Sequence, residues 1–362
     1  MKNYLPLSGF QQNRRKFLKS QAILGLGTIA GTMGSSNLFA TSLKSKNVNV
    51  DSFDNMRETY LECLGGSFPA STPLNIQIGK SVQKEGYRIL YLSYEAQPGD
   101  RIPALLLIPD SASADSPVPG IAVWHQHNGE YHLGKSEPAG LAGNPMHHTA
   151  VALAHEGYVV LCPDALCFEE RQDPTGILKG GEYERFEFLR QIVRGRSLAW
   201  KSILDMKRAI DLLGERPEVL SDQLGCYGHS MGSTHAWLVS PLEPRLKCTI
   251  GNCCLPTYEG IEEEHLLHCF PNFVPGWTKY GDTPEIAALI VPRALHLNFG
   301  EKDEGSPIES AKRGLDRIAE TYKKAGAAEN FSYFIEPDKG HVLSEAMWQH
   351  VKEVFKKHLK TT

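Results

Sequence analysis

A serine lies between two glycines in the segment 228–232, which reads GHSMG. The segment follows a short apolar run at 224–227 and precedes a helical pattern that begins near Ser233. At a strand-to-helix turn, flanking glycines permit a tight bend that exposes the Ser230 hydroxyl. The first amides of the helix point to the same place, so the N–H of Met231 can bind an oxyanion formed on a carbonyl. The pattern predicts a nucleophilic serine, with a glycine-rich turn carrying an idle serine as the alternative.

A serine hydroxyl at its ordinary pKa is a poor nucleophile and needs a base, which in turn needs an acid to orient it. Asp303 follows the apolar run 294–299, and His341 follows the run 331–335. Because ligands bind at the carboxyl ends of parallel strands, we expect Ser230, Asp303 and His341 to converge there. The alternatives are a solvated loop histidine and an aspartate that only caps a helix. Other carboxylates that could orient the histidine are Glu259, Glu301 and Glu304.

A third segment, WHQHNG at 124–129, follows the apolar run 121–124. Its backbone is expected to supply the second oxyanion donor, which we assign to the amide of His127 with Gln126 as a close alternative. Histidines gather in this region at positions 125, 127, 132, 147 and 148. They could form a metal site, but neutral imidazoles also line clefts as polar groups. We therefore expect neither a metal nor a cofactor.

The elements that must position these residues follow a regular alternation. Two β-rich runs, 87–94 and 102–108, flank turn residues at 97–100 and predict an antiparallel hairpin. Short apolar runs typical of covered parallel strands follow at 121–124, 158–162, 224–227, 248–252, 294–299 and 331–335. Helical periodicity separates them, most clearly at 203–213 and 347–355. The sequence predicts an α/β fold with a doubly wound, mostly parallel sheet and an N-terminal antiparallel hairpin. Two longer connections, 168–184 and 255–285, could cover a site.

The N-terminus has the layout of an export signal. Basic residues at 2, 14, 15, 16 and 19 precede an uncharged, glycine-punctuated stretch at 21–40, and no acid occurs before Asp51. The segment 13–19, NRRKFLK, resembles a twin-arginine signal with Asn13 in place of the usual serine or threonine. We expect cleavage after Ala40, with an uncleaved anchor as the alternative, and a periplasmic or secreted protein that needs the twin-arginine translocation machinery. A linker with a short helix near 53–64 would fill 41–80, and the catalytic domain would span 81–362.

Composition limits the class of protein. The chain has 362 residues, 41% of them hydrophobic, with 38 basic and 42 acidic side chains and a formal net charge of −4. Because it carries no basic block, nucleic acid is not an expected partner. Past residue 40, no stretch is long and apolar enough to span a bilayer. The eight cysteines lie mostly in apolar contexts, so we expect buried thiols rather than a disulfide framework.

From about Tyr87 to its C-terminus the chain resembles the α/β-hydrolase superfamily, in the branch of dienelactone hydrolases and acetyl xylan esterases. The motifs that carry the resemblance are 124–129 with Lys135 and Glu137, 162–171, 195–219 leading to the serine turn, 292–303 and 340–341. The resemblance implies an α/β-hydrolase fold and a Ser230, Asp303, His341 triad. Dienelactone hydrolases carry cysteine as nucleophile, so Ser230 favours ordinary ester hydrolysis. Related hydrolases carry a glycine where this chain has Gln126.

These expectations combine into an exported serine esterase that acts through an acyl-enzyme on short, acetyl-type esters of carbohydrates. Aromatic faces stack on sugars and imidazoles bind hydroxyls, so we expect four residues to line the substrate cleft. They are His125, Tyr131, His229 and Trp277. The alternatives are a serine hydrolase of small peptides and a binding protein that has lost catalysis on the same scaffold.

Overall fold

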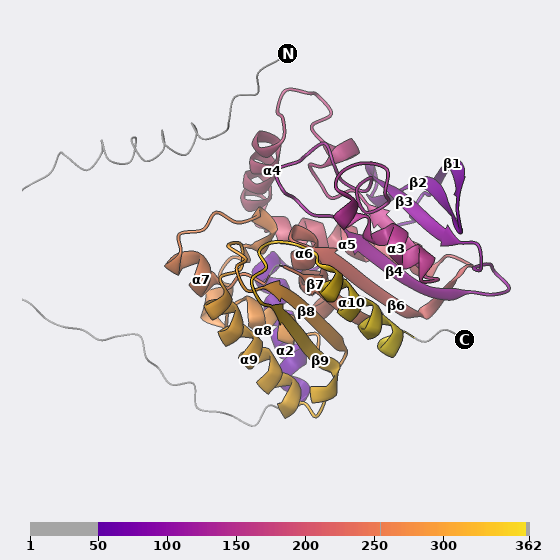
Figure 1. Cartoon of the computed structure of the whole chain (residues 1–362). Coiled ribbons are helices and arrows are strands. Elements are labelled where there is room, and N and C mark those ends of the chain that lie inside the picture. The colour runs from indigo at the N-terminus through magenta and orange to yellow at the C-terminus, as the bar shows by residue number, and fades with distance from the viewer. Residues whose placement is uncertain (1–49, 254, 360–362) are drawn as a thin grey trace, which may run out of the picture. The chain divides into compact units, whose positions relative to one another are not determined.

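The computed structural model describes residues 50–253 and 255–359 (Figure 1). They belong to the larger of two compact units, Val48–Thr362. The expected export signal at 1–40 lies outside the described residues. Within the described residues, no helix combines the length and the apolar character that a bilayer span requires.

One sheet of nine strands runs through the described part of the chain, in the order β1-β2-β3-β5-β4-β6-β7-β8-β9. The strands are β1 (Gln77–Lys84), β2 (Tyr87–Gln97), β3 (Asp100–Pro109), β4 (Val118–Trp124), β5 (Val159–Pro163), β6 (Val219–His229), β7 (Leu246–Asn252), β8 (Ala294–Gly300) and β9 (Phe331–Glu336). The first three strands pair antiparallel, and β3 pairs antiparallel with β5. From β5 to β9 the neighbours are parallel. The chain therefore has the α/β-hydrolase fold that its sequence predicts.

The helices cover both faces of the sheet. They are α2 (Val50–Leu64), α3 (Thr149–His155), α4 (Gly181–Val193), α5 (Leu198–Gly214), α6 (Met231–Val239), α7 (Tyr258–Glu263), α8 (Thr283–Ala288), α9 (Ile308–Lys324) and α10 (Glu345–His358). Side chains of α3 and α10 share one apolar core, and those of α2, α5, α6, α8 and α9 share the other. Figure 1 shows α10 in front of the strands and α2 behind them.

Alternation along the strands feeds the two cores. In β4, Ile121 and Val123 enter the core beneath α3 and α10, whereas Ala122 and Trp124 enter the opposite core. Both faces of the strand are buried, which explains why its sequence reads as a continuous apolar run.

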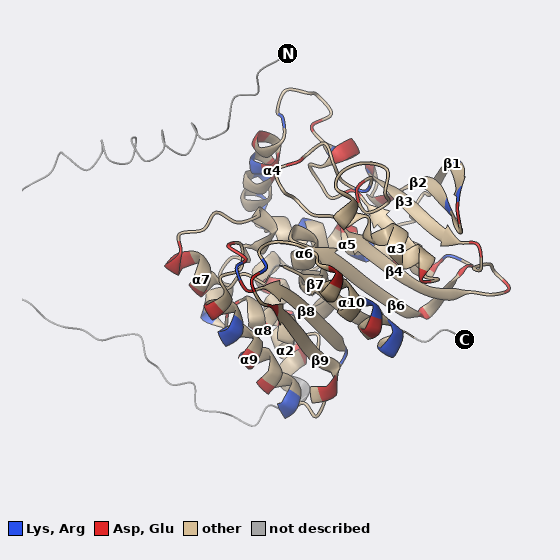
Figure 2. Cartoon of the chain, in the orientation of Figure 1, with Lys and Arg blue, Asp and Glu red and all other residues tan. Residues whose placement is uncertain are grey.

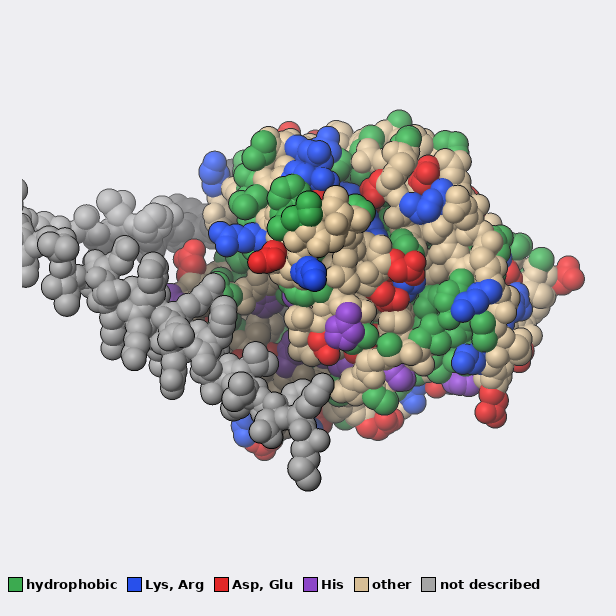
Figure 3. Space-filling model, turned by 90° about the horizontal axis from the view of Figure 1, so that it is seen from above, with side chains coloured by type: hydrophobic (Ala, Val, Ile, Leu, Met, Phe, Trp, Pro, Cys, Tyr) green, Lys and Arg blue, Asp and Glu red, His purple; other side chains and the backbone are tan. Residues whose placement is uncertain are grey.

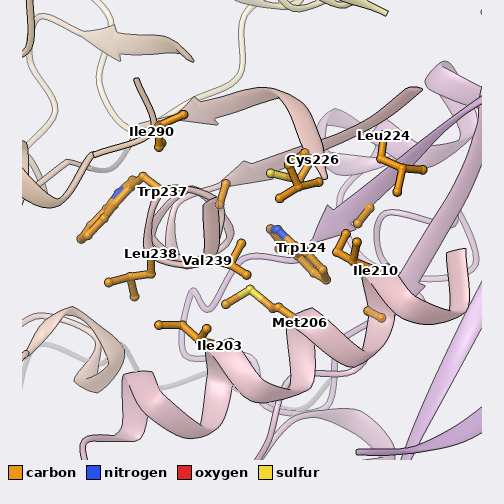
Figure 4. Close-up of a cluster of buried hydrophobic side chains, with 14 of the residues drawn as sticks. Trp124, Ile203, Met206, Ile210, Leu224, Cys226, Trp237, Leu238, Val239 and Ile290 are labelled. Atoms are coloured by element: carbon orange, nitrogen blue, oxygen red, sulfur yellow. The ribbon is translucent and has the colours of Figure 1, made fainter. Parts of the chain in front are cut away.

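The helix α5 fixes the sheet beneath the serine turn. Its periodic residues Ile203, Met206 and Ile210 are fully or almost fully buried, and Figure 4 shows them facing Trp124 and the side chains of α6. Because these contacts lie within one dense core, truncating a single buried Ile or Leu there would cost about 2–5 kcal/mol. This packing holds α5, β4 and α6 together in one core next to the serine turn.

One strand differs from the sequence-based expectation. The strand β1 was not expected, because its residues are mostly polar and almost all exposed, which is typical of an edge strand. A domain boundary after residue 80 falls inside this strand. The short helix expected near 53–64 is present as α2, which begins at Val50 and buries Tyr60 and Leu64 completely in the main core. Charges of both signs are spread over the outer helices, with acidic residues on α7 and mixed signs on α9 and α10 (Figure 2).

Candidate active site

Ser230 forms the turn between the last residue of β6 and the first residue of α6. Its backbone has φ 58° and ψ −121°, a conformation that a residue with a side chain adopts at a cost of about 1–3 kcal/mol. A Cβ on Gly228 would lie 2.0 Å from the carbonyl carbon of Gly232. A Cβ on Gly232 would lie 2.0 Å from the carbonyl oxygen of Trp124. Both glycines of the motif are therefore required by close backbone approach.

The contact at Gly232 brings the first turn of α6 against the end of β4. The loop with Gln126 and His127 starts one residue beyond this contact, and a Cβ on Gly232 would also be 3.1 Å from the carbonyl oxygen of His125. In a helix, the first amides have no intrahelical acceptor, so the N–H of Met231 is available for a ligand. The geometry places both expected oxyanion donors on adjoining segments.

Asp303 and His341 form a direct pair. Both carboxylate oxygens of Asp303 lie 3.0 Å from Nδ1 of His341, and the carboxyl side chain is fully buried while that of His341 is 39% exposed. The amide of Gly305 donates to Oδ1 of Asp303 at 2.8 Å. A carboxylate held in this way fixes the imidazole with its Nδ1–H toward the acid and its Nε2 free for the substrate side.

The other candidate carboxylates have different neighbours. Glu259 pairs with Arg313 at the surface, Glu301 accepts from the amide of Asp338, and Glu304 is exposed. Asp303 is thus the carboxylate that contacts His341. Its position after β8 depends on Gly300, where a Cβ would meet the carbonyl oxygen of Gly340 at 2.1 Å.

Asn252, the last residue of β7, connects the serine turn to the histidine loop. Its carbonyl oxygen accepts from the amide of Ser230 at 2.8 Å. Its Nδ2 donates to Nδ1 of His229 at 2.7 Å and to the carbonyl oxygen of Val342 at 3.1 Å. The ring of His229 lies 5.0 Å from that of His341, centroid to centroid. The three loops that carry the expected triad therefore meet at one place.

Two buried imidazoles flank the expected base. The ring of His229 contacts those of both His341 and His147 in tilted arrangements, and the ring of His147 lies 4.6 Å from it, centroid to centroid. Burial, followed by the nearby His341, lowers the pKa of His147 to about 4. Burial also places the pKa of His229 well below its ordinary value. Both rings are neutral at pH 7, so they add no positive charge beside His341.

The loop after β4 is bound to α4 through a polar cluster. Nε2 of His127 lies 3.0 Å from Oε2 of Glu184, and the hydroxyl of Tyr131 donates to the same oxygen at 2.7 Å. Nδ1 of His127 accepts from the amide of Gly129 at 2.9 Å, which leaves the ring proton on Nε2. This cluster orients the loop that contains the expected oxyanion donor.

A buried ammonium anchors the same segment further along the chain. Nζ of Lys135 lies 2.8 Å from Asp164, 2.8 Å from Glu169 and 2.6 Å from Glu170. Burial opposes the charge of the lysine, but the three carboxylates outweigh burial and raise the pKa of Lys135 above its ordinary value. His125 is neutral because burial lowers its pKa to about 4, and its Nε2 accepts from the amide of Ala165.

Four of the five histidines that could have formed a metal site, at 125, 127, 147 and 148, make separate hydrogen bonds or ring contacts, and His132 is exposed. His148, for example, lies 3.1 Å from the carbonyl oxygen of Ala142. Among the described residues, two side-chain groups have ligand atoms close enough for a shared cation: Cys253 with Asp303 and His341, and Asp164 with Glu169 and Glu170. The first group contains the expected acid and base, and the second already holds the Lys135 ammonium. Figure 3 shows histidine side chains gathered on one face of the molecule, some set back in a hollow.

Trp277 does not line the site, and that expectation was wrong. Its side chain is fully buried, its Nε1 donates to the carbonyl oxygen of Asp282, and its ring packs edge-on against Tyr60 at 5.6 Å. His125 is also buried with both ring nitrogens in hydrogen bonds, so it supports the loop rather than offering a polar atom to a substrate. Tyr131 is half-buried beside His127.

Sequence reasoning missed several residues that hold the site together. They are Glu184, Asn252 and His268, the last of which lies 2.8 Å from the carbonyl oxygen of Gly305. Of these, Asn252 gives a usable signal, because it ends a buried strand where a polar side chain is unexpected.

The family comparison covers most of this structure. The family model described as the dienelactone hydrolase family matches residues 102–359, from β3 to the end of the sheet and its last helix. The chain belongs to the dienelactone hydrolase family. Members of this family are hydrolases by name, and the serine turn and the Asp303–His341 pair both lie within the matched region.

Individual relatives agree with this assignment. The Bacillus subtilis (strain 168) protein YtaP is 27% identical over 279 residues, 75% of this chain and 89% of that protein. A glucuronoyl esterase from Solibacter usitatus superposes with a TM-score of 0.63 at 16% identity, covering 86% of this chain and 94% of the other. An acetyl xylan esterase from Paenibacillus sp. R4 gives a TM-score of 0.57 at 16% identity, covering 87% and 97%. At these identities the two structures support the fold.

Proposed function

We propose that this dienelactone hydrolase family member is a serine esterase that cleaves carboxylic esters through an acyl-enzyme. The observation that carries the proposal is the buried Asp303 carboxylate, which lies 3.0 Å from Nδ1 of His341. The loop of His341 is connected to the strained Ser230 turn through hydrogen bonds of Asn252. An orienting acid, a base and a partly exposed serine are the parts that acyl transfer needs.

In the proposed mechanism, Nε2 of His341 takes the proton of Ser230 while Oγ attacks the ester carbonyl carbon. The negative charge that develops on the carbonyl oxygen is bound by the amides of Met231 and His127, with Gln126 as the alternative second donor. Collapse of this intermediate expels the alcohol, which takes its proton from His341. Water then attacks the acyl-enzyme while His341 takes a proton from it. As the carboxylic acid product leaves, His341 returns this proton to Oγ of Ser230.

We propose short, acetyl-type esters of carbohydrates as substrates. The half-buried rings of His127 and Tyr131 supply aromatic surface on the loop after β4, which suits a sugar ring better than a long acyl chain. His229, the other residue expected to contact the substrate, is buried. The fold neighbours named as an acetyl xylan esterase and a glucuronoyl esterase are consistent with this class of substrate.

The test is a series of p-nitrophenyl esters together with acetylated xylan. We expect kcat/KM to be highest for acetate and to fall beyond about four carbons, because a small pocket rejects each added methylene at about 1–3 kcal/mol. Rates that rise toward octanoate, without acetate release from xylan, would contradict the substrate class. No hydrolysis of any ester would contradict the esterase itself.

We also propose export through the twin-arginine route, on the basis of the N-terminal sequence alone. Replacing Arg14 and Arg15 by lysine should keep the protein and its activity in the cytoplasm, because a receptor reads the arginine pair. Replacing Lys2 by arginine is the control. Unimpaired export of the double variant would contradict the route.

A further inference from the structure

Three buried side chains near the serine turn each carry a polar atom without a hydrogen-bond partner. They are Tyr227 and His229 of β6 and His147 of the short 3₁₀ helix before α3, which are 1%, 4% and 7% exposed. Oη of Tyr227, Nε2 of His229 and Nδ1 of His147 make no hydrogen bond within the part of the chain that the structure describes. Burying a polar atom unpaired is costly, so nearly all such atoms bond to protein or to ordered water.

The same three side chains line one small cavity, where the loop after β4, the end of β6 and the start of α3 meet. About 10 Å³ of this cavity is open to the centre of a water-sized sphere, which is room for about one water molecule. Gln126 and Glu137 also line the cavity, but they already bond to each other, Nε2 to Oε2, at 3.0 Å. The unpartnered atoms and the cavity therefore point independently to one ligand site.

The hydrogen-bonding roles of these atoms define the ligand. Nδ1 of His229 accepts from Nδ2 of Asn252 at 2.7 Å, so the proton of this neutral ring is on Nε2. Nε2 therefore donates, and it has no lone pair for a metal ion. The Tyr227 hydroxyl can donate or accept, and Nδ1 of His147 does either according to its tautomer. The ligand must accept from His229 and bond to two further groups, which a water molecule does with its two protons and two lone pairs.

We propose that this cavity binds one water molecule, which accepts from Nε2–H of His229 and bonds to the Tyr227 hydroxyl and to Nδ1 of His147. About three hydrogen bonds are typical of a buried water. The water holds the His229 ring at the nitrogen opposite the one that the side-chain amide of β7 already holds. Because this ring lies 5.0 Å from that of His341, centroid to centroid, the water fixes the surroundings of the expected base.

The sign of one stability change tests the water. Tyr227→Phe deletes the hydroxyl and keeps the ring. Without a partner for that hydroxyl, the variant would be as stable as the wild type or more stable, because an unpaired buried polar group is removed. With the water as partner, we expect the equilibrium constant for unfolding to rise about 2- to 10-fold and the Tm to fall. The matched control is Tyr322→Phe, since Tyr322 is fully buried and its hydroxyl donates to the carbonyl oxygen of Arg293 at 2.9 Å.

We expect the two variants to lose stability to a similar degree. A Tyr227→Phe protein as stable as the wild type, beside a destabilised Tyr322→Phe, overturns the proposal.

A high-resolution crystal structure of the wild-type protein locates the water directly. We expect one peak of electron density about 2.7–3.2 Å from each of the three atoms. If Tyr227, His229 and His147 bond to protein groups instead, or no peak lies among them, the proposal fails even where Tyr227→Phe is destabilised. Neither measurement uses ester hydrolysis, so the water site is tested independently of the proposed reaction.

Discussion

The side chain of Asn252 fixes the ring of His229. Its Nδ2 donates to Nδ1 of His229 at 2.7 Å, so the ring proton of this neutral imidazole is on Nε2. The second Nδ2 hydrogen is used by the carbonyl oxygen of Val342, next to His341. One side-chain amide thus holds in place His229, the residue before Ser230, and Val342, the residue after His341.

Asn252→Ala should remove the hydrogen bonds that hold the His229 ring and the Val342 carbonyl group. The change leaves Nδ1 of His229 and the Val342 carbonyl without a donor in a buried place, so we expect a loss of about 2–4 kcal/mol in the free energy of unfolding and a fall in kcat. Asn330→Ala, which removes a hydrogen bond to Pro292 at the surface, is the control for stability. Denaturant unfolding and ester hydrolysis measure the two effects; a stable variant with normal kcat would exclude this role.

Ser230→Ala should lower kcat by about 10⁴- to 10⁶-fold, because triad members act as a unit. Thermal stability should change little, since the deleted hydroxyl is small and partly exposed. His341→Ala should produce a loss of similar size. Steady-state kinetics with p-nitrophenyl acetate, together with thermal unfolding, checks both expectations. A Ser230→Ala variant with ordinary activity would show that another group is the nucleophile.

Asp303→Asn should cost about 10²- to 10⁴-fold in kcat, because the amide leaves the imidazole in the wrong tautomer. The structure offers two carboxylates for comparison, Glu259 in its surface pair with Arg313 and the exposed Glu304. Glu259→Gln and Glu304→Gln should leave kcat near the wild-type value. A nearly silent Asp303→Asn beside a damaging glutamate variant would reassign the acid.

The serine turn and the order of the expected triad could be predicted because their signals are local. Gly228 and Gly232 permit one close turn, and Asp303 and His341 each follow a strand that its apolar run identifies. Trp277 could not be placed in the same way. Its burial depends on Tyr60 of α2, more than 200 residues earlier in the chain, and a loop sequence does not reveal which side faces a core.

The residues missed by the sequence share this dependence on distant partners. Glu184 reads as an ordinary surface glutamate until α4 is seen to face His127. Because the outward side of α4 is apolar, the periodicity of the helix even suggests the opposite orientation. Tertiary contacts, rather than helix propensity, decide which face of α4 meets the site.

Stability should fall as the pH drops from about 6.5 to about 4. Burial lowers the pKa of His125, His147 and His296 to about 4 and that of His235 to about 3. In this window the unfolded chain binds protons that the folded chain does not, so acid favours unfolding by up to about 1.4 kcal/mol per pH unit for each imidazole. Above about pH 6.5 these imidazoles are neutral in both the folded and the unfolded chain, so the stability that acid removes is fully present there.

Denaturant unfolding between pH 4 and 8 measures that slope. His235→Leu removes a buried imidazole whose Nε2 has no partner among the described residues, and it should make the acid slope shallower. His132→Gln, at an exposed position, should leave the slope as in the wild type. Identical slopes in all three proteins would contradict a neutral, buried His235.

The ammonium of Lys135 is surrounded by three carboxylates, an arrangement that could also hold a metal cation. Its Nζ lies 2.6–2.8 Å from oxygens of Asp164, Glu169 and Glu170, and these oxygens lie close enough together to share one ion. Lys135→Ala leaves the carboxylates to repel one another around a vacated volume. Because removing one partner of a buried ion pair leaves uncompensated charge, we expect a loss of about 3–5 kcal/mol in the free energy of unfolding.

Calcium should restore part of that loss in the Lys135→Ala protein, because Ca²⁺ binds carboxylate oxygens at about 2.3–2.6 Å and completes its shell with water. Millimolar calcium should therefore raise the Tm of this variant and leave the wild-type Tm unchanged, since the ammonium fills the site. Lys302→Ala, which breaks an exposed pair with Asp338, controls for a general effect of the ion. If calcium changes the Tm of none of the three proteins, the expected cation site does not form in the Lys135→Ala variant. The three carboxylates would then move apart without the ammonium, and Lys135 would be the group that holds them together.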